Sequence, residues 1–273
     1  GYRGTGLELT VSNPSLREYL LENGYAWAAS SYSTNGYDVA QGVKDTHALG
    51  TLFNGIVKKP KRTYITGHSM GGHITAVLAE QYRNAYDGAL PMCGVTGDTA
   101  LFDYFTDYNL VAQALAGINK EDQKFPGDDI YTNNTVPYII GTLGINQKNL
   151  TKEGEILKAV TMNLSGGERP LYDVAFESYK NFLFGQLTPD PTFMVAAGNV
   201  IDTTKSVYQF DEDMSTISDE EQALNDAVRR ISADPQTKQQ GLTGVPKVKG
   251  NHKIPMVSIH NIGDLFVPFH MQQ

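Results

Sequence analysis

A serine stands between two glycines in Gly67-His68-Ser69-Met70-Gly71, a segment of the form G-x-S-x-G. The short segment before it, Thr63–Thr66, predicts a strand, and the apolar residues after it recur at helical spacing. A strand that turns sharply into a helix lifts the serine hydroxyl out of the sheet, where it can attack a carbonyl carbon. The turn also points the Met70 N–H toward the reacting oxygen, at a helix N-terminus that favours negative charge. Ser69 is therefore the predicted nucleophile.

We expect the glycines of this turn to be a steric requirement. Ser69 must adopt strained dihedral angles, and a side chain at Gly67 or Gly71 would then meet neighbouring backbone. His68, inside the turn, is expected to pack beneath it. The alternative is a glycine-rich turn whose serine only caps the following helix.

Two aspartates are candidates to orient a histidine. Asp264 follows the predicted strand Ile254–His260, and a carboxylate at the carboxyl end of a strand is well placed for that role. The alternative is that Asp264 caps the next helix. Asp98, which follows the predicted strand Ala89–Cys93, is the second candidate.

The opening segment Gly1-Tyr2-Arg3-Gly4-Thr5-Gly6 is rich in glycine and precedes the first predicted helix. Such a loop can offer a second backbone donor to an oxyanion, and the Tyr2 N–H is the natural candidate. The alternative is a plain glycine-rich loop.

Together these segments resemble the α/β-hydrolase superfamily, specifically the serine esterases that carry a cap. The similarity rests on the G-H-S-M-G-G turn, the oxyanion loop and the acid segment G-D-x-x-V-P, and it covers residues 1–98 and 254–268. The resemblance implies cleavage of carboxylic esters through an acyl-enzyme on Ser69, without metal or organic cofactor. It implies Asp264 as the acid, and Met70 with Tyr2 as the oxyanion donors.

The histidine base is the part of the family pattern that this sequence lacks. The family places one more strand and then the histidine after the acid, whereas the sequence reaches Gln273 soon after Asp264. We therefore expect the catalytic histidine beyond residue 273. Of the six histidines present, His270 is the first to test.

The order of elements predicts an α/β fold, with a mostly parallel sheet and helices on both faces. Its strands are expected at Tyr25–Ser30, Thr63–Thr66, Ala89–Cys93 and Ile254–His260, and its helices begin near Asn13, Asp38 and Ser69. Residues 1–98 and 249–273 form the predicted hydrolase core.

Residues 99–248 are predicted to form a mainly helical cap over Ser69. One helix spans Leu101–Leu115, a second begins near Pro170, and a third opens with a capping box at Ser218–Glu221. The aromatic residues of the cap would suit an aromatic or hydrophobic acyl group, or they are simply its core. They are Phe102, Tyr104, Phe105, Tyr108, Phe182 and Phe184.

Composition restricts the possible partners. A formal charge of −8 and the absence of any Lys/Arg cluster longer than Lys58–Arg62 argue against nucleic-acid binding. No apolar run approaches the length of a membrane span, and the single cysteine, Cys93, rules out an intrachain disulfide. A small ester is the expected substrate. The strands that the family places before the oxyanion loop and after the acid are absent from this sequence. A sheet without these outer strands is expected to pair with a second copy of the chain.

Two other functions remain open at this point. A serine peptidase of the prolyl-oligopeptidase type shares the serine turn and the D-x-x-V-P pattern at Asp264–Pro268. A non-catalytic binding protein on a hydrolase scaffold would explain a missing base.

Overall fold

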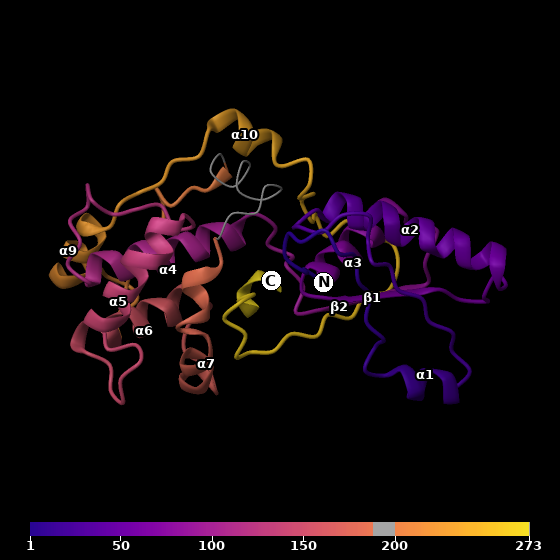
Figure 1. Cartoon of the computed structure of the whole chain (residues 1–273), viewed down its shortest axis with the longest axis horizontal. Coiled ribbons are helices and arrows are strands. Elements are labelled where there is room, and N and C mark those ends of the chain that lie inside the picture. The colour runs from indigo at the N-terminus through magenta and orange to yellow at the C-terminus, as the bar shows by residue number, and fades with distance from the viewer. Residues whose placement is uncertain (188–199, 273) are drawn as a thin grey trace. The chain divides into compact units, whose positions relative to one another are not determined.

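A computed structural model describes residues 1–187 and 200–272 (Figure 1), which divide into two compact units. The first unit comprises residues 1–98 and 241–259. The second comprises the described parts of 99–240, together with 260–272. The chain is thus a mixed α and β protein, and each unit has its own core.

A small parallel sheet is the centre of the first unit. β1 (Tyr64–His68) pairs in parallel with β2 (Gly88–Met92). Residues 255–259 run in parallel along the other edge of β2: the Ala89 N–H donates to the Pro255 carbonyl at 3.0 Å. The three strands expected around these positions are confirmed, the third in the form of isolated bridges.

Pro91 explains why the third strand is interrupted. It lies in β2 between Ala89 and Cys93, whose amides both donate to the 255–259 segment. Proline has no N–H, so the ladder lacks the bond that residue 91 would otherwise donate. The Pro91 carbonyl still accepts from the Ile259 amide at 3.1 Å, which keeps the segment in register.

Two long helices follow from clear sequence signals. α2 (Val39–Ile56) begins after Asp38, whose carboxylate accepts a hydrogen bond from the Gln41 amide at 2.9 Å. α3 (Met70–Gln81) packs against both strands and against α2. Both helices are confirmed.

The first elements of the chain differ from those predicted. α1 (Arg17–Glu22) begins after Leu16 rather than after Asn13, although Gly24 has the expected left-handed φ of +76°. Residues 25–30 do not form the expected buried strand. They are mostly exposed, because no strand of the described chain lies beside them to complete a ladder.

The expectation of helices on both faces of the sheet is wrong for the described part of the first unit. α3 covers one face, while α1 buries none of its residues. The opposite face leaves apolar side chains exposed: Tyr64 by 55%, Val257 by 63% and Ile259 by 55%.

The second unit is helical, with α4 (Ala100–Leu115) at its centre. α4 contacts α6 (Lys152–Leu164), α9 (Asp219–Ala227) and the short helix η2 (Phe182–Gly185). The remaining helices are η1 (Tyr131–Thr135), α5 (Val136–Thr142), α7 (Tyr172–Tyr179), α10 (Pro235–Gln240) and η3 (Phe269–Gln272). The predicted helices correspond to α4, α7 and α9, while the other six in the described part of the unit were not predicted as separate helices.

The capping box that opens α9 is present as predicted. The Glu221 amide donates to the Ser218 hydroxyl at 3.4 Å, and the Ser218 amide donates to the Glu221 carboxylate at 3.0 Å. The Glu221 carboxylate also accepts the amides of Phe210 and Asp211, and these bonds hold its pKa below the ordinary value despite burial. One carboxylate therefore fixes both the start of α9 and the loop before it.

Most of the aromatic residues proposed to line a substrate cleft form the core of this unit. Those with little or no exposure are Phe102, Tyr104, Phe105, Tyr108 and Phe184. Only Phe182, at 44%, is exposed among the six. The alternative that these aromatics are core residues is therefore correct for five of them, and they give no support for an aromatic acyl group.

A carboxylate is also buried in this core. Asp107 on α4 accepts hydrogen bonds from the Ser206 hydroxyl at 2.7 Å and the Tyr208 hydroxyl at 2.8 Å. Burial raises the pKa of Asp107 to about 7, and neighbouring Asp103 adds to the rise. The two hydroxyl bonds and the positive charge of Arg230 act in the opposite direction.

Replacing Asp107 by Asn should remove a pH dependence of stability. The pKa of Asp107 is higher in the folded state than in the unfolded chain, so its stabilising contribution is present at low pH and is lost as the pH rises through about 7. Compared with Asp107→Asn, the native protein should lose up to about 1.4 kcal/mol of unfolding free energy per pH unit between pH 5 and 7. Urea unfolding at several pH values measures the difference, and the exposed Asp226→Asn is the control. Parallel curves for native protein and Asp107→Asn would contradict this account.

Candidate active site

Ser69 occupies the turn between β1 and α3 in a strained conformation. Its φ is 58° and its ψ is −123°, a region that residues with a side chain rarely adopt. Its amide donates to the Met92 carbonyl at 3.0 Å, and its carbonyl accepts the amides of Gly72 at 2.8 Å and His73 at 3.2 Å. The serine backbone is thus fixed by β2 on one side and by α3 on the other.

Close backbone contacts explain part of the glycine pattern. A Cβ at Gly67 would lie 2.1 Å from the Gly71 carbonyl oxygen, and one at Gly72 would lie 2.5 Å from the Gly94 Cα. At Gly71 a Cβ would make only ordinary contacts, 3.7 Å from the Gly1 nitrogen. The steric requirement predicted for Gly67 is confirmed and that for Gly71 is wrong. The requirement at Gly72 was not predicted.

The Ser69 hydroxyl does not cap α3. Its side chain accepts no hydrogen bond from the helix amides, although Ser69 occupies the N-cap position. The alternative of a merely capping serine therefore has no support in the geometry. The Met70 side chain is buried, so Met70 could contribute to chemistry only through its amide.

The N-terminal loop lies against the Ser69 turn. A Cβ at Gly1 would lie 3.4 Å from the His68 carbonyl oxygen. Tyr2, the predicted second oxyanion donor, follows directly. The His68 side chain is exposed rather than packed beneath the turn, because strand alternation places it on the uncovered face with Tyr64.

His73 has a structural role. It is fully buried on α3, where its Nε2 lies 2.8 Å from the Pro246 carbonyl oxygen and its Nδ1 lies 3.3 Å from the Tyr37 hydroxyl. Burial lowers its pKa, which favours the neutral ring, and both of its nitrogens are engaged. Burial raises the pKa of Tyr37, and the negative charge of Asp98, the second candidate acid, adds to the rise.

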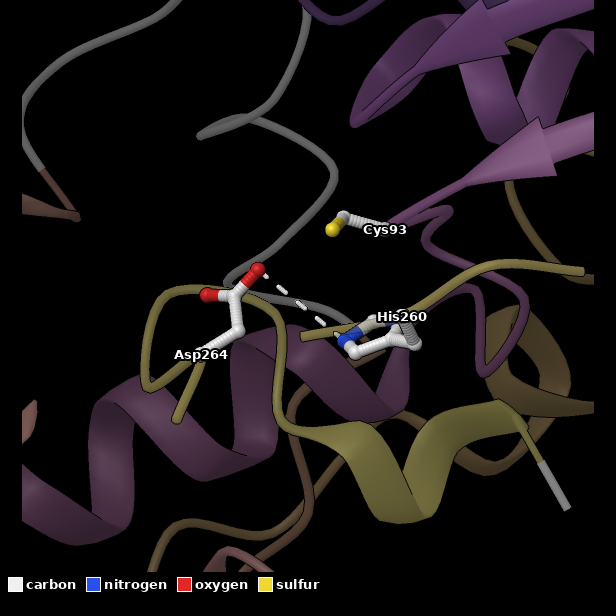
Figure 2. A group of neighbouring side chains, drawn as sticks. All are labelled: Cys93, His260 and Asp264. Carbon is white, nitrogen blue, oxygen red and sulfur yellow. Dashed lines mark ion pairs between the residues drawn. The ribbon is translucent and has the colours of Figure 1, made fainter. Parts of the chain in front are cut away.

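Asp264 is placed in the second unit, in a tight turn. Its Oδ1 accepts the amides of Phe266 and Val267, both at 2.9 Å. Its Oδ2 faces the Nε2 of His260 at 3.9 Å, too long for a hydrogen bond (Figure 2). Asp264 therefore shapes its own turn with one oxygen and presents the other to an imidazole.

His260 was not singled out as a partner for the acid. Its Nε2 lies 2.7 Å from the Val267 carbonyl, which indicates that Nε2 carries the proton. Its Nδ1 is buried and makes no hydrogen bond in the described chain. The four-residue spacing of His260 and Asp264 across a turn was the available sequence signal.

His270 makes different contacts from His260. It lies in η3, burial lowers its pKa, and it hydrogen-bonds the Ser165 backbone, which acts in the opposite direction. The second unit thus pairs Asp264 with His260 rather than with His270. Ser69, Met70 and Tyr2 belong to the first unit, and Asp264 belongs to the second.

Comparison with known proteins gives no match, whether with family models, curated proteins or solved structures. No helix within residues 1–187 and 200–272 combines the length and apolar character needed to cross a membrane.

Alanine substitutions at two glycines of the Ser69 turn should have different effects on stability. Gly67→Ala forces a Cβ onto backbone and should cost at least about 1–3 kcal/mol, whereas Gly71→Ala should stay close to the native stability. Gly55→Ala, in open space on α2, should stabilise by about 0.5–1 kcal/mol and serves as the control. Thermal and urea unfolding measure all three. Equal losses at Gly67 and Gly71 would contradict the described packing.

Proposed function

We propose that this chain is a serine hydrolase that cleaves carboxylic esters through an acyl-enzyme on Ser69. The observation that carries the proposal is the strained, uncapped conformation of Ser69 between a strand and a helix. Such a backbone costs about 1–3 kcal/mol, and a glycine at this position would avoid most of that cost. A serine kept there without a capping bond favours a role for its hydroxyl.

The proposed reaction has two halves. The Ser69 Oγ attacks the ester carbonyl carbon, and a histidine takes the hydroxyl proton. The Met70 and Tyr2 amides stabilise the oxyanion, and its collapse releases the alcohol, protonated by the same histidine. Water then attacks the acyl-enzyme, releasing the carboxylic acid and restoring the Ser69 hydroxyl.

The other parts of the chain have proposed roles in the same scheme. Asp264 is the acid that orients and stabilises the protonated histidine. We assign the first unit to an α/β-hydrolase core and the second to a cap. The small parallel sheet, with α3 directly after the serine turn, supports the first assignment, and the helical composition of the second unit supports the other.

Ser69→Ala should abolish both ester turnover and labelling by a fluorophosphonate probe. The probe reacts only with an activated hydroxyl, so loss of labelling identifies the nucleophile. We expect hydrolysis of p-nitrophenyl butyrate to fall by at least 10³-fold. Ser178→Ala, on α7, should behave as the native protein. Ester turnover by Ser69→Ala within tenfold of the native rate would contradict the assignment of Ser69 as the nucleophile. If the native protein is folded but is never labelled by the probe, a non-catalytic binding protein is favoured.

Ser69→Gly tests the strain argument separately from catalysis. The variant should be as inactive as Ser69→Ala, yet about 1 kcal/mol more stable than the native protein, because glycine adopts a positive φ without strain. Urea unfolding of the three proteins measures this. A loss of stability in Ser69→Gly would remove the observation on which the proposal rests.

A further inference from the structure

The loop that carries Asp264, residues 260–268, is attached to the helices of its own unit. We call it the acid loop. From α4, the Tyr104 hydroxyl donates to the Leu265 carbonyl at 3.1 Å. From the segment before α7, the Arg169 Nε donates to the Ile262 carbonyl at 2.6 Å. The backbone of the loop is therefore held on both sides of Asp264.

Aromatic packing adds a third attachment. The Phe266 ring lies between two rings of the helical unit. It stacks on Phe105 with centroids 5.7 Å apart and meets Phe182 edge-on at 4.8 Å. Phe266 is also a residue whose amide donates to Asp264, so this packing bears directly on the carboxylate.

Arg169 makes contacts at both ends of the acid loop. Besides the bond to Ile262, its guanidinium lies over the Phe269 ring, 5.4 Å from the centroid, and over the Tyr172 ring at 5.0 Å. Its remaining donors bind the Gly167 carbonyl at 2.7 Å and the Ser165 hydroxyl at 2.8 Å. The planar, forked guanidinium suits this set of acceptors and rings, which the single ammonium of a lysine could not match.

The charge of Arg169 has no acidic partner in the described chain, since all its hydrogen bonds go to neutral oxygens. Burial accordingly lowers the pKa of its guanidinium. An apolar side chain could cover the two rings as well, but it could not donate hydrogen bonds to the oxygens of Ile262, Gly167 and Ser165. The contacts of Arg169 therefore indicate that it keeps the backbone of the acid loop in one conformation.

The loop geometry in turn determines where the acid points. The Phe266 and Val267 amides hold one Asp264 oxygen, and the Val267 carbonyl holds the His260 ring. A shift of this backbone would therefore reorient the carboxylate and the imidazole together.

We propose that Arg169 is a positioning residue: by holding the backbone of the acid loop, it sets the orientation of the Asp264 carboxylate and of the neighbouring His260 imidazole. The inference rests on the proposed function, because it takes Asp264 as the acid. Arg169 makes no hydrogen bond to Asp264, and its proposed effect is exerted through the backbone of the acid loop.

The test compares Arg169→Met with a matched arginine in the full chain. Arg230 also lies over a ring, 4.4 Å from the Tyr208 centroid, and also donates to backbone carbonyls, those of Thr203 and Ser206. Within the described residues, its hydrogen bonds and its ring contact go to Thr203, Ser206, Asn225 and Tyr208, none of which belongs to the acid loop. Arg230→Met therefore controls for loss of an arginine that stacks and binds carbonyls.

Two readouts separate positioning from general stability. Arg169→Met should lower kcat for p-nitrophenyl butyrate about 10- to 100-fold with KM within threefold, since a small displacement of a catalytic group has effects of this size. Amide hydrogen exchange at Phe266 and Val267 should become at least tenfold faster. Arg230→Met should change neither, and Arg169→Lys should recover only part of the loss in kcat.

The outcomes are distinct. Unchanged exchange at Phe266 and Val267 in Arg169→Met would overturn the inference, as would faster exchange with an unchanged kcat. An equal fall in kcat for Arg169→Met and Arg230→Met would also overturn it. If the native protein turns over no ester and Ser69 is not labelled, the proposed function fails first, and the exchange result still shows whether Arg169 holds the loop.

Discussion

Direct contact between backbones at the end of β1 is the constraint on which the first unit depends. Gly67 faces the carbonyl of Gly71 and Gly72 faces the Cα of Gly94, with no side chain between them. α3 can therefore begin immediately after the strand, and the residue at the corner has to take a positive φ. The strain at Ser69 follows from this packing, and its two backbone anchors keep it in place.

The parts of the fold that the sequence predicted well are set by local chemistry. A strand followed by a glycine turn, an aspartate before α2 and the capping box at Ser218 each act within a few residues. The predicted strand at residues 25–30 failed because its stability depends on a neighbour from elsewhere in the chain. The aromatic residues of α4 were ambiguous for a similar reason, since burial by other helices decides whether a ring lines a cleft or fills a core.

Only part of the candidate site could likewise be predicted from the sequence. Ser69 and Asp264 could be proposed because short motifs surround them. His260 and Arg169 were not proposed, because their significance lies in carbonyl oxygens that they reach only in the folded chain, at Val267 and Ile262. For His260, one local signal was present in its four-residue spacing from Asp264. Hydrogen bonds from side chains to backbone groups far away in the chain produce no periodic pattern in the sequence.

The order in which the sheet is assembled along the chain has a consequence for how the protein is made. β1 and β2 are close in sequence, but the 255–259 segment reaches the second edge of β2 only after residues 99–240, the larger part of the helical unit, have been synthesised. Until then that edge exposes unpaired amides and carbonyls, which can pair with any extended chain nearby. Contacts so distant in sequence also form slowly, because a long loop must close first. The newly made chain should therefore pass through a stage that binds chaperones, and it should refold more efficiently when dilute.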